Sequence, residues 1–194
     1  MNEKTGQPIR HTKLLYMVEC ALFAAILCIF SPIQIPIGPI PIAMSVFAVM
    51  FTGVCLGWKT GAAAVIVYIF IGICGMPLFA GGTSGLPALA GLTGGYIWSY
   101  IFMVIIIGLF CRIPSKKYIT SVIIAVAGCL LGLIVCYICG TAQYMLLSGC
   151  GLLESLAVCV FPFIPFDILK AVCASLLGVS LKTALRRCGI SLPE

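Results

Sequence analysis

Long apolar runs, separated by short breaks of charged residues or of glycine and proline, make up most of the chain. An α-helix needs about 20 apolar residues to cross a bilayer. The positions of the breaks predict six membrane-spanning helices, at about 14–32, 43–57, 61–75, 94–111, 118–147 and 165–187. We therefore expect one membrane domain over residues 1–194, an all-α bundle of six transmembrane helices that follows a tail of residues 1–13.

Composition supports a membrane protein and excludes a soluble domain. Of the 194 residues, 62% are hydrophobic and 8% are charged, whereas soluble domains carry roughly 25% charged residues. Twelve cysteines are present, but only Cys136 and Cys139 form a C-x-x-C pair, and the one histidine, His11, is in the tail. Zinc sites usually need about four such ligands close together, so we expect no metal and no cofactor.

The basic residues predict how the chain is oriented in the membrane. Except for Lys170, every lysine and arginine falls in the tail, in the turn at Lys59, in the connection at 112–117 or after residue 181. The connections on the other side of the predicted bundle carry neither lysine nor arginine. Because cytoplasmic loops are enriched in Lys and Arg, both termini are expected in the cytoplasm. The net charge of +6 needs no nucleic-acid partner to explain it.

Two outer connections are rich in glycine and proline yet apolar and uncharged, "SPIQIPIGPIPIAMS" and "GMPLFAGGTSGLPALAGLTGGY". Irregular backbone at membrane depth is tolerated where it is buried in protein or lines a cavity. These loops either cap the bundle or act as a lid over a ligand site, and the lid is the favoured interpretation.

Asp167 and Lys170 lie inside the apolar run of the last helix. Pro162 and Pro165 prevent a continuous helix before them, which places Asp167 in the first turn and Lys170 one turn further along the same face. A charge at this depth costs roughly 2.5–3.5 kcal/mol, and a buried ion pair stabilises a fold poorly. A structural pair is one interpretation, but a ligand site that opens outward is favoured.

Glu19 is the other charged residue predicted within the membrane. It lies about two turns into the first predicted helix, from where its side chain can reach towards the inner interface. A structural role and a functional role are equally compatible with this position.

The stretches "GGTSGLPALAGLTGGY" and "FIPFDILKA" resemble the signature of the BioY family, the biotin-specific substrate-binding components (S components) of energy-coupling-factor (ECF) transporters. The resemblance covers nearly the whole chain. Leu92 stands where the family usually has proline, and Ala43 and Ser45 stand where threonine and glutamine are common. The matching residues are Gly81, Gly82, Gly85, Gly91, Thr93, Gly94, Gly95, Tyr96, Asp167 and Lys170.

The resemblance implies a high-affinity vitamin-uptake subunit of a prokaryotic cell membrane, which binds biotin in the outer half of the bilayer. Asp167 would accept hydrogen bonds from the ureido N–H groups, and Lys170 would meet a ligand oxygen. Small-molecule pockets combine apolar walls with a few polar groups. The further residues expected at the site are Tyr96, Trp98 and Phe163 as walls, Ser84 and Thr93 as hydrogen-bonding groups, and Gly94 and Gly95.

The resemblance also implies partners, namely one membrane scaffold subunit and two cytoplasmic ATPases. The chain lacks the phosphate-binding pattern G-x-x-x-x-G-K-[ST], so it is not expected to be an enzyme that hydrolyses ATP. Ala21 and Ala25 form an A-x-x-x-A pattern on one helix face, and small residues let another helix approach closely. We expect this face to dock on the scaffold.

Two alternatives to a biotin-binding subunit remain open at this point. An S component for another vitamin, such as thiamine or riboflavin, would have the same architecture. The stretch "GTSG" around Ser84 has the form of the serine motif of rhomboid intramembrane proteases. Such an enzyme needs a general base; His11 lies in a tail on the opposite side, which leaves Lys170 as the remote candidate.

Overall fold

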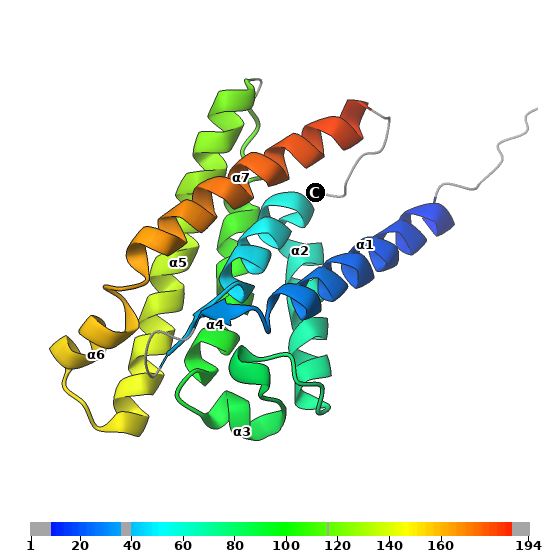
Figure 1. The fold of residues 1–194 in the computed structure, drawn as a ribbon. Helices are drawn as coiled ribbons and strands as arrows, with labels where there is room; N and C mark the ends of the chain where they lie inside the picture. Colours follow the sequence, from blue (N-terminus) through cyan, green and yellow to red (C-terminus); the bar gives the residue numbers. More distant parts are fainter. Residues whose placement is uncertain (1–8, 36–39, 116, 188–194) are drawn as a thin grey trace, which may run out of the picture.

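The computed structural model describes residues 9–35, 40–115 and 117–187, and this part of the chain is almost entirely helical (Figure 1). The long helices are α1 (Ile9–Phe30), α2 (Ser45–Ile73), α4 (Gly94–Phe110), α5 (Tyr118–Ser148) and α7 (Ile164–Arg187). Short elements that the sequence did not predict lie in the connections. They are the antiparallel strands β1 (Gln34–Ile35) and β2 (Ile42–Ala43), the 3-10 turn η1 (Ala80–Gly82), and the helices α3 (Gly85–Ala90) and α6 (Leu152–Cys159).

Helix α2 turns back on itself at Gly57. This residue has φ 73° and ψ −169°, a conformation that glycine adopts without steric cost. A Cβ atom placed on Gly61 would lie 3.8 Å from the Cα of Gly53, although eight residues of straight helix span about 12 Å. The element therefore consists of two antiparallel arms, 45–56 and 58–73, where the sequence predicted separate helices at 43–57 and 61–75 (Figure 1).

Several helices are long and apolar enough to cross a membrane: Lys13–Phe30, Ser45–Ile73, Tyr118–Ser148 and Ile164–Leu185. Counted by length, Ser45–Ile73 is one span, but its reversal at Gly57 makes it two shorter arms. Together with the 17-residue apolar helix α4, and leaving aside the short helices α3 and α6, the described residues form six apolar helical segments. The chain is thus a multi-pass membrane protein with an all-α bundle.

The N-terminal boundary differs from the prediction. Helix α1 begins at Ile9, earlier than the predicted residue 14, because neither proline nor glycine lies between Pro8 and residue 14. Residues 1–8 of the predicted tail lie outside the described residues, as do residues 36–39 of the first outer loop and residues 188–194 at the C-terminus.

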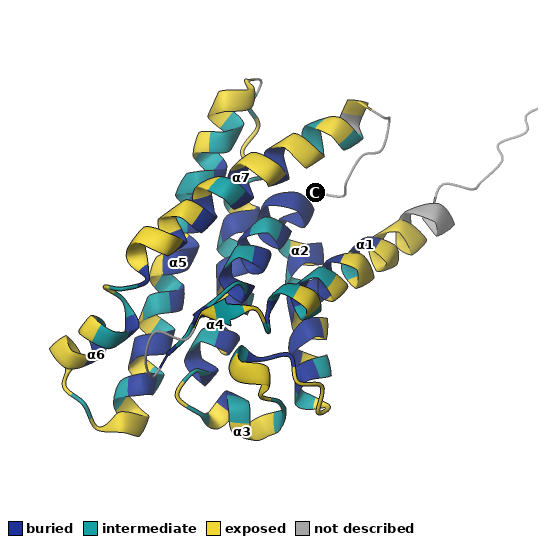
Figure 2. Ribbon diagram, viewed as in Figure 1, coloured by how far each residue is buried: buried dark blue, intermediate teal, exposed yellow. Residues whose placement is uncertain are grey.

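Helix α4 forms the middle of the bundle and packs against α2 and α5. Its residues Met103, Val104 and Ile107 are completely buried. In Figure 2, α1 and α7 are largely exposed (yellow) on the side that faces away from the other helices. A Cβ atom on Gly108 would lie 2.2 Å from the backbone nitrogen of Trp58, so the glycine lets α4 touch α2 directly. Small residues at such crossings are typical of membrane bundles.

The glycine- and proline-rich connections fold inward over one end of the bundle. Ile42 of the first connection and Phe79 of the second are buried. Gln143 of α5 donates from Nε2 to the carbonyl oxygens of Leu89 (2.9 Å) and Gly91 (2.8 Å), which fixes the second connection against the bundle. We call this end, which also carries α3 and α6, the loop end.

Candidate functional site

A closely walled cavity lies inside the loop end, and we call it the capped cavity. Its empty space, with the open solvent at its mouth included, is about 580 Å³, and its walls are mostly apolar with a few polar groups, as in small-molecule sites. Residues from both arms of α2, from α4, α5 and α7, and from the connections line it: Ser31, Ile40, Pro41, Ala43, Ser45, Val46, Tyr68, Ala80, Thr93, Tyr96, Ile97, Tyr100, Leu133, Cys136, Tyr137, Phe163, Asp167 and Lys170.

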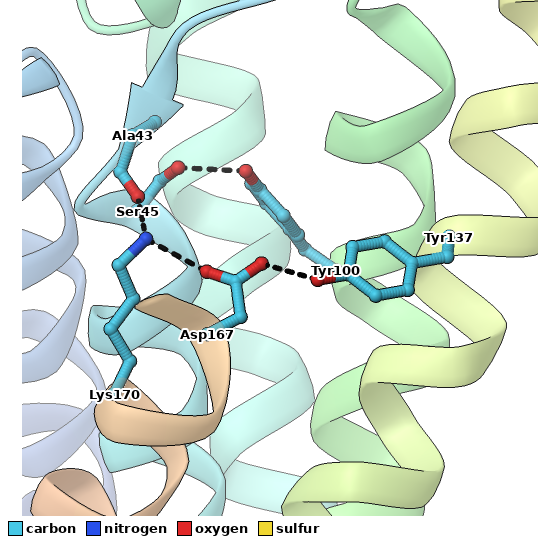
Figure 3. A network of polar contacts seen from close by, with 6 residues as sticks. All are labelled: Ala43, Ser45, Tyr100, Tyr137, Asp167 and Lys170. Atoms are coloured by element: carbon cyan, nitrogen blue, oxygen red, sulfur yellow. Dashed lines mark hydrogen bonds and ion pairs between the residues drawn. The ribbon is translucent and has the colours of Figure 1, made fainter. Parts of the chain in front are cut away.

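The two charged residues of α7 form a buried ion pair in the wall of this cavity (Figure 3). Helix α7 begins at Ile164, with Pro165 in its first turn, where proline's missing N–H group is not needed. Asp167 therefore lies in the first turn as well, close to the positive end of the helix dipole. Lys170 donates from Nζ to Asp167 Oδ1 at 2.9 Å. The exposed fractions are 2% for Asp167 and 8% for Lys170.

Two further groups complete the surroundings of the pair, and the sequence had pointed to neither. The hydroxyl group of Tyr137, on α5, donates to Asp167 Oδ2 at 2.8 Å. Lys170 donates a second hydrogen bond to the carbonyl oxygen of Ala43 in β2, also at 2.9 Å. The ion pair is thus held from three directions, by its own helix, by α5 and by the first connection (Figure 3).

The first connection departs from the family pattern at Ala43 and Ser45, but it still contributes polar atoms to the cavity. Ala43 contributes its main-chain oxygen to Lys170, a role for which the identity of the side chain is unimportant. The hydroxyl groups of Ser45 and Tyr100 lie 2.7 Å apart and are hydrogen bonded at the cavity wall.

Three of the predicted wall and hydrogen-bonding residues also line the cavity, namely Tyr96, Phe163 and Thr93. Tyr96 donates from its hydroxyl group to the carbonyl oxygen of Cys159 at 3.0 Å, which ties α4 to the end of α6. A Cβ atom on Gly140 of α5 would lie 2.3 Å from Cζ of Tyr96. The missing side chain at position 140 therefore provides the space in which the Tyr96 ring sits.

The other predicted site residues do not line the capped cavity, and their contact with a ligand stays a prediction. A Cβ atom on Gly94 would lie 1.8 Å from the carbonyl oxygen of Leu89, and one on Gly95 would lie 2.5 Å from that of Cys139. These glycines serve close backbone packing and do not line the cavity. Trp98 is 46% exposed and is absent from the lining, because it occupies the outward face of α4.

Ser84 lies in a second hollow at the loop end rather than in the capped cavity. The two spaces share the lining residues Pro41, Ala80 and Thr93, so the second hollow adjoins the cavity. Ser84 precedes α3 and has no side-chain capping hydrogen bond to it. Its contact with a ligand stays a prediction.

The ion pair keeps unused hydrogen-bonding capacity that faces the cavity. An ammonium group has three donors and a carboxylate oxygen has about two acceptor positions. Lys170 uses two of its donors, on Asp167 and Ala43, and each oxygen of Asp167 accepts one hydrogen bond, from Lys170 or Tyr137. One donor and further acceptor positions remain. The site suits a compact ligand that both donates and accepts hydrogen bonds.

The sequence profile of the BioY family matches residues 2–187, which is nearly the full length of the chain. This protein belongs to the BioY family. A relative described as biotin transporter BioY2, from Lactococcus lactis subsp. cremoris, is 32% identical over 91% of this chain and 95% of the relative. Biotin transporter BioY from Thermotoga maritima is also 32% identical, over 86% of this chain and 95% of the relative.

A solved structure is similar in fold as well as in sequence. The crystal structure of the S component for biotin from an ECF-type ABC transporter superposes with a TM-score of 0.81. It is 27% identical in sequence, and the match covers 91% of this chain and 95% of that chain. The BioY resemblance inferred from the glycine-rich loop and from Asp167 and Lys170 is thus confirmed for the chain as a whole.

Membership of the BioY family makes this chain a transporter component and not an enzyme. The geometry also removes the basis for a serine protease. Lys170, the remote candidate for a general base, is hydrogen bonded to Asp167 inside the capped cavity, whereas Ser84 lines the adjoining hollow. Among the residues that the structure describes, no group of three metal-ligating side chains is present.

The remaining residues singled out in the BioY sequence lie on α1. Ala21 and Ala25 are exposed on the same face of the helix, as a docking face requires, although their role stays a prediction. Glu19 is buried, with 7% of its surface exposed, and neither of its carboxylate oxygens has a hydrogen-bond partner among the described residues. It is absent from the lining of the capped cavity.

Proposed function

We propose that this member of the BioY family binds biotin in the capped cavity and acts as the substrate-binding subunit of an ECF transporter. The observation that carries the proposal is the buried Asp167–Lys170 pair, which lines an apolar, loop-covered cavity and retains free hydrogen-bonding positions. The names of the relatives and of the similar crystal structure support biotin as the ligand.

The chemistry of biotin fits these positions. Its ureido ring carries two N–H donors and one carbonyl oxygen, and its side chain ends in a carboxylate. The free acceptor positions of Asp167 suit a ureido N–H group, and the third donor of Lys170 suits a ligand oxygen. Tyr96 and Phe163 offer aromatic surface to the sulfur-containing ring, since pockets of this kind are mostly apolar with a few polar groups.

The binding test is direct identification of the natural ligand. Gentle solubilisation and purification of the full chain, followed by denaturation and mass analysis of the released molecules, should yield biotin. Recovery of thiamine or riboflavin in its place would leave the S-component assignment intact but overturn the choice of vitamin.

The proposed orientation places both termini in the cytoplasm and the loop end outside. It rests on the basic residues at the start of α1, at the turn of α2, in the α4–α5 connection and late in α7, together with the bias of Lys and Arg towards cytoplasmic segments. Biotin would then enter from outside, and a membrane scaffold subunit with two cytoplasmic ATPases would drive its release inside.

The scaffold would dock on the face of α1 formed by Ala21 and Ala25. Their side chains are small and exposed, and helix association in lipid relies on close packing at such positions. Replacing both by leucine should prevent co-purification with the scaffold and abolish biotin uptake by cells, while the isolated chain still binds biotin. Loss of biotin binding with retained co-purification would show that the roles of α1 and of the loop end have been exchanged.

A further inference from the structure

A second polar space lies at the end of the bundle opposite the loop end, and we call it the basic hollow. It is formed by the α4–α5 connection, the first turns of α5 and the last turns of α7, and its polar lining consists of Arg112, Ser115, Ser121, Lys182 and Thr183. Lys182 lies twelve residues beyond Lys170, about 18 Å further along α7. The empty space, with its opening included, is about 1040 Å³.

The two cations of the basic hollow have no carboxylate partner in the described part of the chain. The only ion pair found among those residues is the one in the capped cavity. The other described acids, Glu19 and Glu154, belong to α1 and α6, neither of which lines the hollow. Arg112 and Lys182 are 70 positions apart in the sequence, yet both line one space that no carboxylate of the described residues lines.

The hydroxyl groups in the lining already donate hydrogen bonds to backbone carbonyl oxygens of the protein. Ser115 and Ser121 donate to the carbonyl oxygen of Lys117, and Thr183 donates to that of Val179. The donors left for a ligand are therefore the guanidinium group and the ammonium group. Such a donor set selects an anion rather than a neutral polar molecule.

The shape of the hollow is fixed by a contact between its two long walls. The hydroxyl groups of Tyr118, at the start of α5, and Ser180, on α7, lie 2.9 Å apart and are hydrogen bonded. The α4–α5 connection is held by backbone hydrogen bonds from Arg112 to Leu109 (3.2 Å) and from Ile113 to Phe110 (3.0 Å). Both cations thus extend from elements that hydrogen bonds hold in place.

We infer that the basic hollow binds a phosphate group, carried by an anionic phospholipid or by free inorganic phosphate. Arginine provides a planar fork of donors that matches phosphate geometry, and lysine adds a compact charge. The lipid source has support from the neighbouring surface, because Ile123 and Leu181, next to lining residues on α5 and α7, are 62% and 36% exposed. On the proposed orientation this end meets the leaflet that carries anionic lipids.

The test uses the full chain purified in a neutral detergent, with native mass spectrometry as the readout. Phosphatidylglycerol, phosphatidylcholine and inorganic phosphate are added in separate titrations. The wild type should retain phosphatidylglycerol in preference to phosphatidylcholine, and R112Q combined with K182Q should weaken this binding about tenfold or more, because two charge-assisted contacts are lost. The matched controls are K117Q and K59Q, which remove exposed charges at the same end from residues outside the lining.

The arms of the experiment separate the possible sources. Retention of inorganic phosphate that competes with phosphatidylglycerol and disappears in the double variant would assign the site to a free phosphate ion. Equal loss in K117Q and in the double variant would overturn the inference, since binding would then follow overall surface charge. Failure of all three probes to bind the wild type would overturn it as well. K182R, which keeps the charge, guards against misfolding and should retain the lipid.

Discussion

The two ends of the bundle treat charge in opposite ways. At the loop end, Asp167 and Lys170 are buried, paired at 2.9 Å and linked to Tyr137 and Ala43. At the opposite end, Arg112 and Lys182 face a wide hollow. None of the described carboxylates lines this hollow or pairs with either cation. Residues of α5 and α7 line both sites, so these two helices contribute to a neutral pair at one end and to net positive charge at the other.

The difference indicates what each end can recognise. A buried charge without a partner is costly, so the charges of the capped cavity compensate each other, and their free positions select a ligand by hydrogen-bond pattern and shape. At the membrane surface water screens the cations of the basic hollow, and no partner within the protein is needed. Hydrogen-bond matching therefore governs the capped cavity, and net charge governs the basic hollow.

The largest effect is expected from breaking the pair at the loop end. Asp167→Asn keeps the side-chain shape but removes a charged acceptor, which is worth about 1.5–3 kcal/mol. Biotin affinity should fall by about 10- to 150-fold, as measured by titration of the purified variant. Some loss of thermal stability is also expected, because Lys170 loses its counter-charge. Unchanged affinity combined with lower stability would mean that the pair is purely structural.

Filling the space beside Tyr96 should distort the capped cavity without touching its charges. In Gly140→Leu the new side chain would occupy the position of the Tyr96 ring, and such overpacking costs about 1–3 kcal/mol. Thermal unfolding should show the loss of stability, and biotin binding should weaken with it. Gly151→Ala is the control, since a Cβ atom there has no neighbour within 4 Å. Equal losses in both variants would contradict the assigned packing role.

Removing one tyrosine hydroxyl group at each end should show whether the two sites act independently. Tyr137→Phe removes the donor to Asp167 Oδ2, and a hydrogen bond to a charged group contributes about 1.5 kcal/mol or more. Part of this is regained if water reaches the carboxylate, so we expect biotin affinity to fall by about three- to tenfold. Tyr118→Phe removes the hydroxyl that pairs with Ser180 at the opposite end and should leave biotin affinity unchanged. A similar fall in both variants would indicate a global effect.

Added salt should change biotin affinity at the capped cavity least of all, whereas it should clearly reduce lipid retention at the basic hollow. Raising ionic strength from about 0.1 M to about 1 M shortens the screening length from about 10 Å to about 3 Å. Exposed charges feel this strongly and buried pairs much less. Biotin affinity, followed by titration at each salt concentration, should change by less than about twofold, while retention of phosphatidylglycerol should decline markedly. Parallel declines would remove the distinction between the two ends.

Much of this arrangement could be predicted from the sequence because its causes are local. The apolar runs indicated the helices, and Gly57 lies at the break between two of them. Pro162 and Pro165 placed the start of α7 to within one residue, and the spacing of Asp167 and Lys170 placed both on one face. A pair three positions apart on one helix is visible without knowledge of the rest of the fold.

The partners from other helices could not be predicted, because nothing in the sequence relates position 137 or position 43 to α7. The exposed position of Trp98 could not be predicted either, because α4 is apolar on all sides and its pattern does not reveal which face is buried. Gly94 and Gly95 were taken as ligand contacts because they belong to a binding motif, yet their contribution is close backbone packing. Glycine has no side chain, and two adjacent glycines at the start of a helix could have suggested this packing role.

The most direct test of the central claim is calorimetric titration of the purified full chain with biotin, without ATP and without other subunits. Thiamine and riboflavin are titrated in parallel. We predict saturable binding of biotin alone, with one site per chain, because the capped cavity is formed entirely by this chain. Binding of thiamine or riboflavin with none of biotin, or no binding until other subunits are added, would contradict the account.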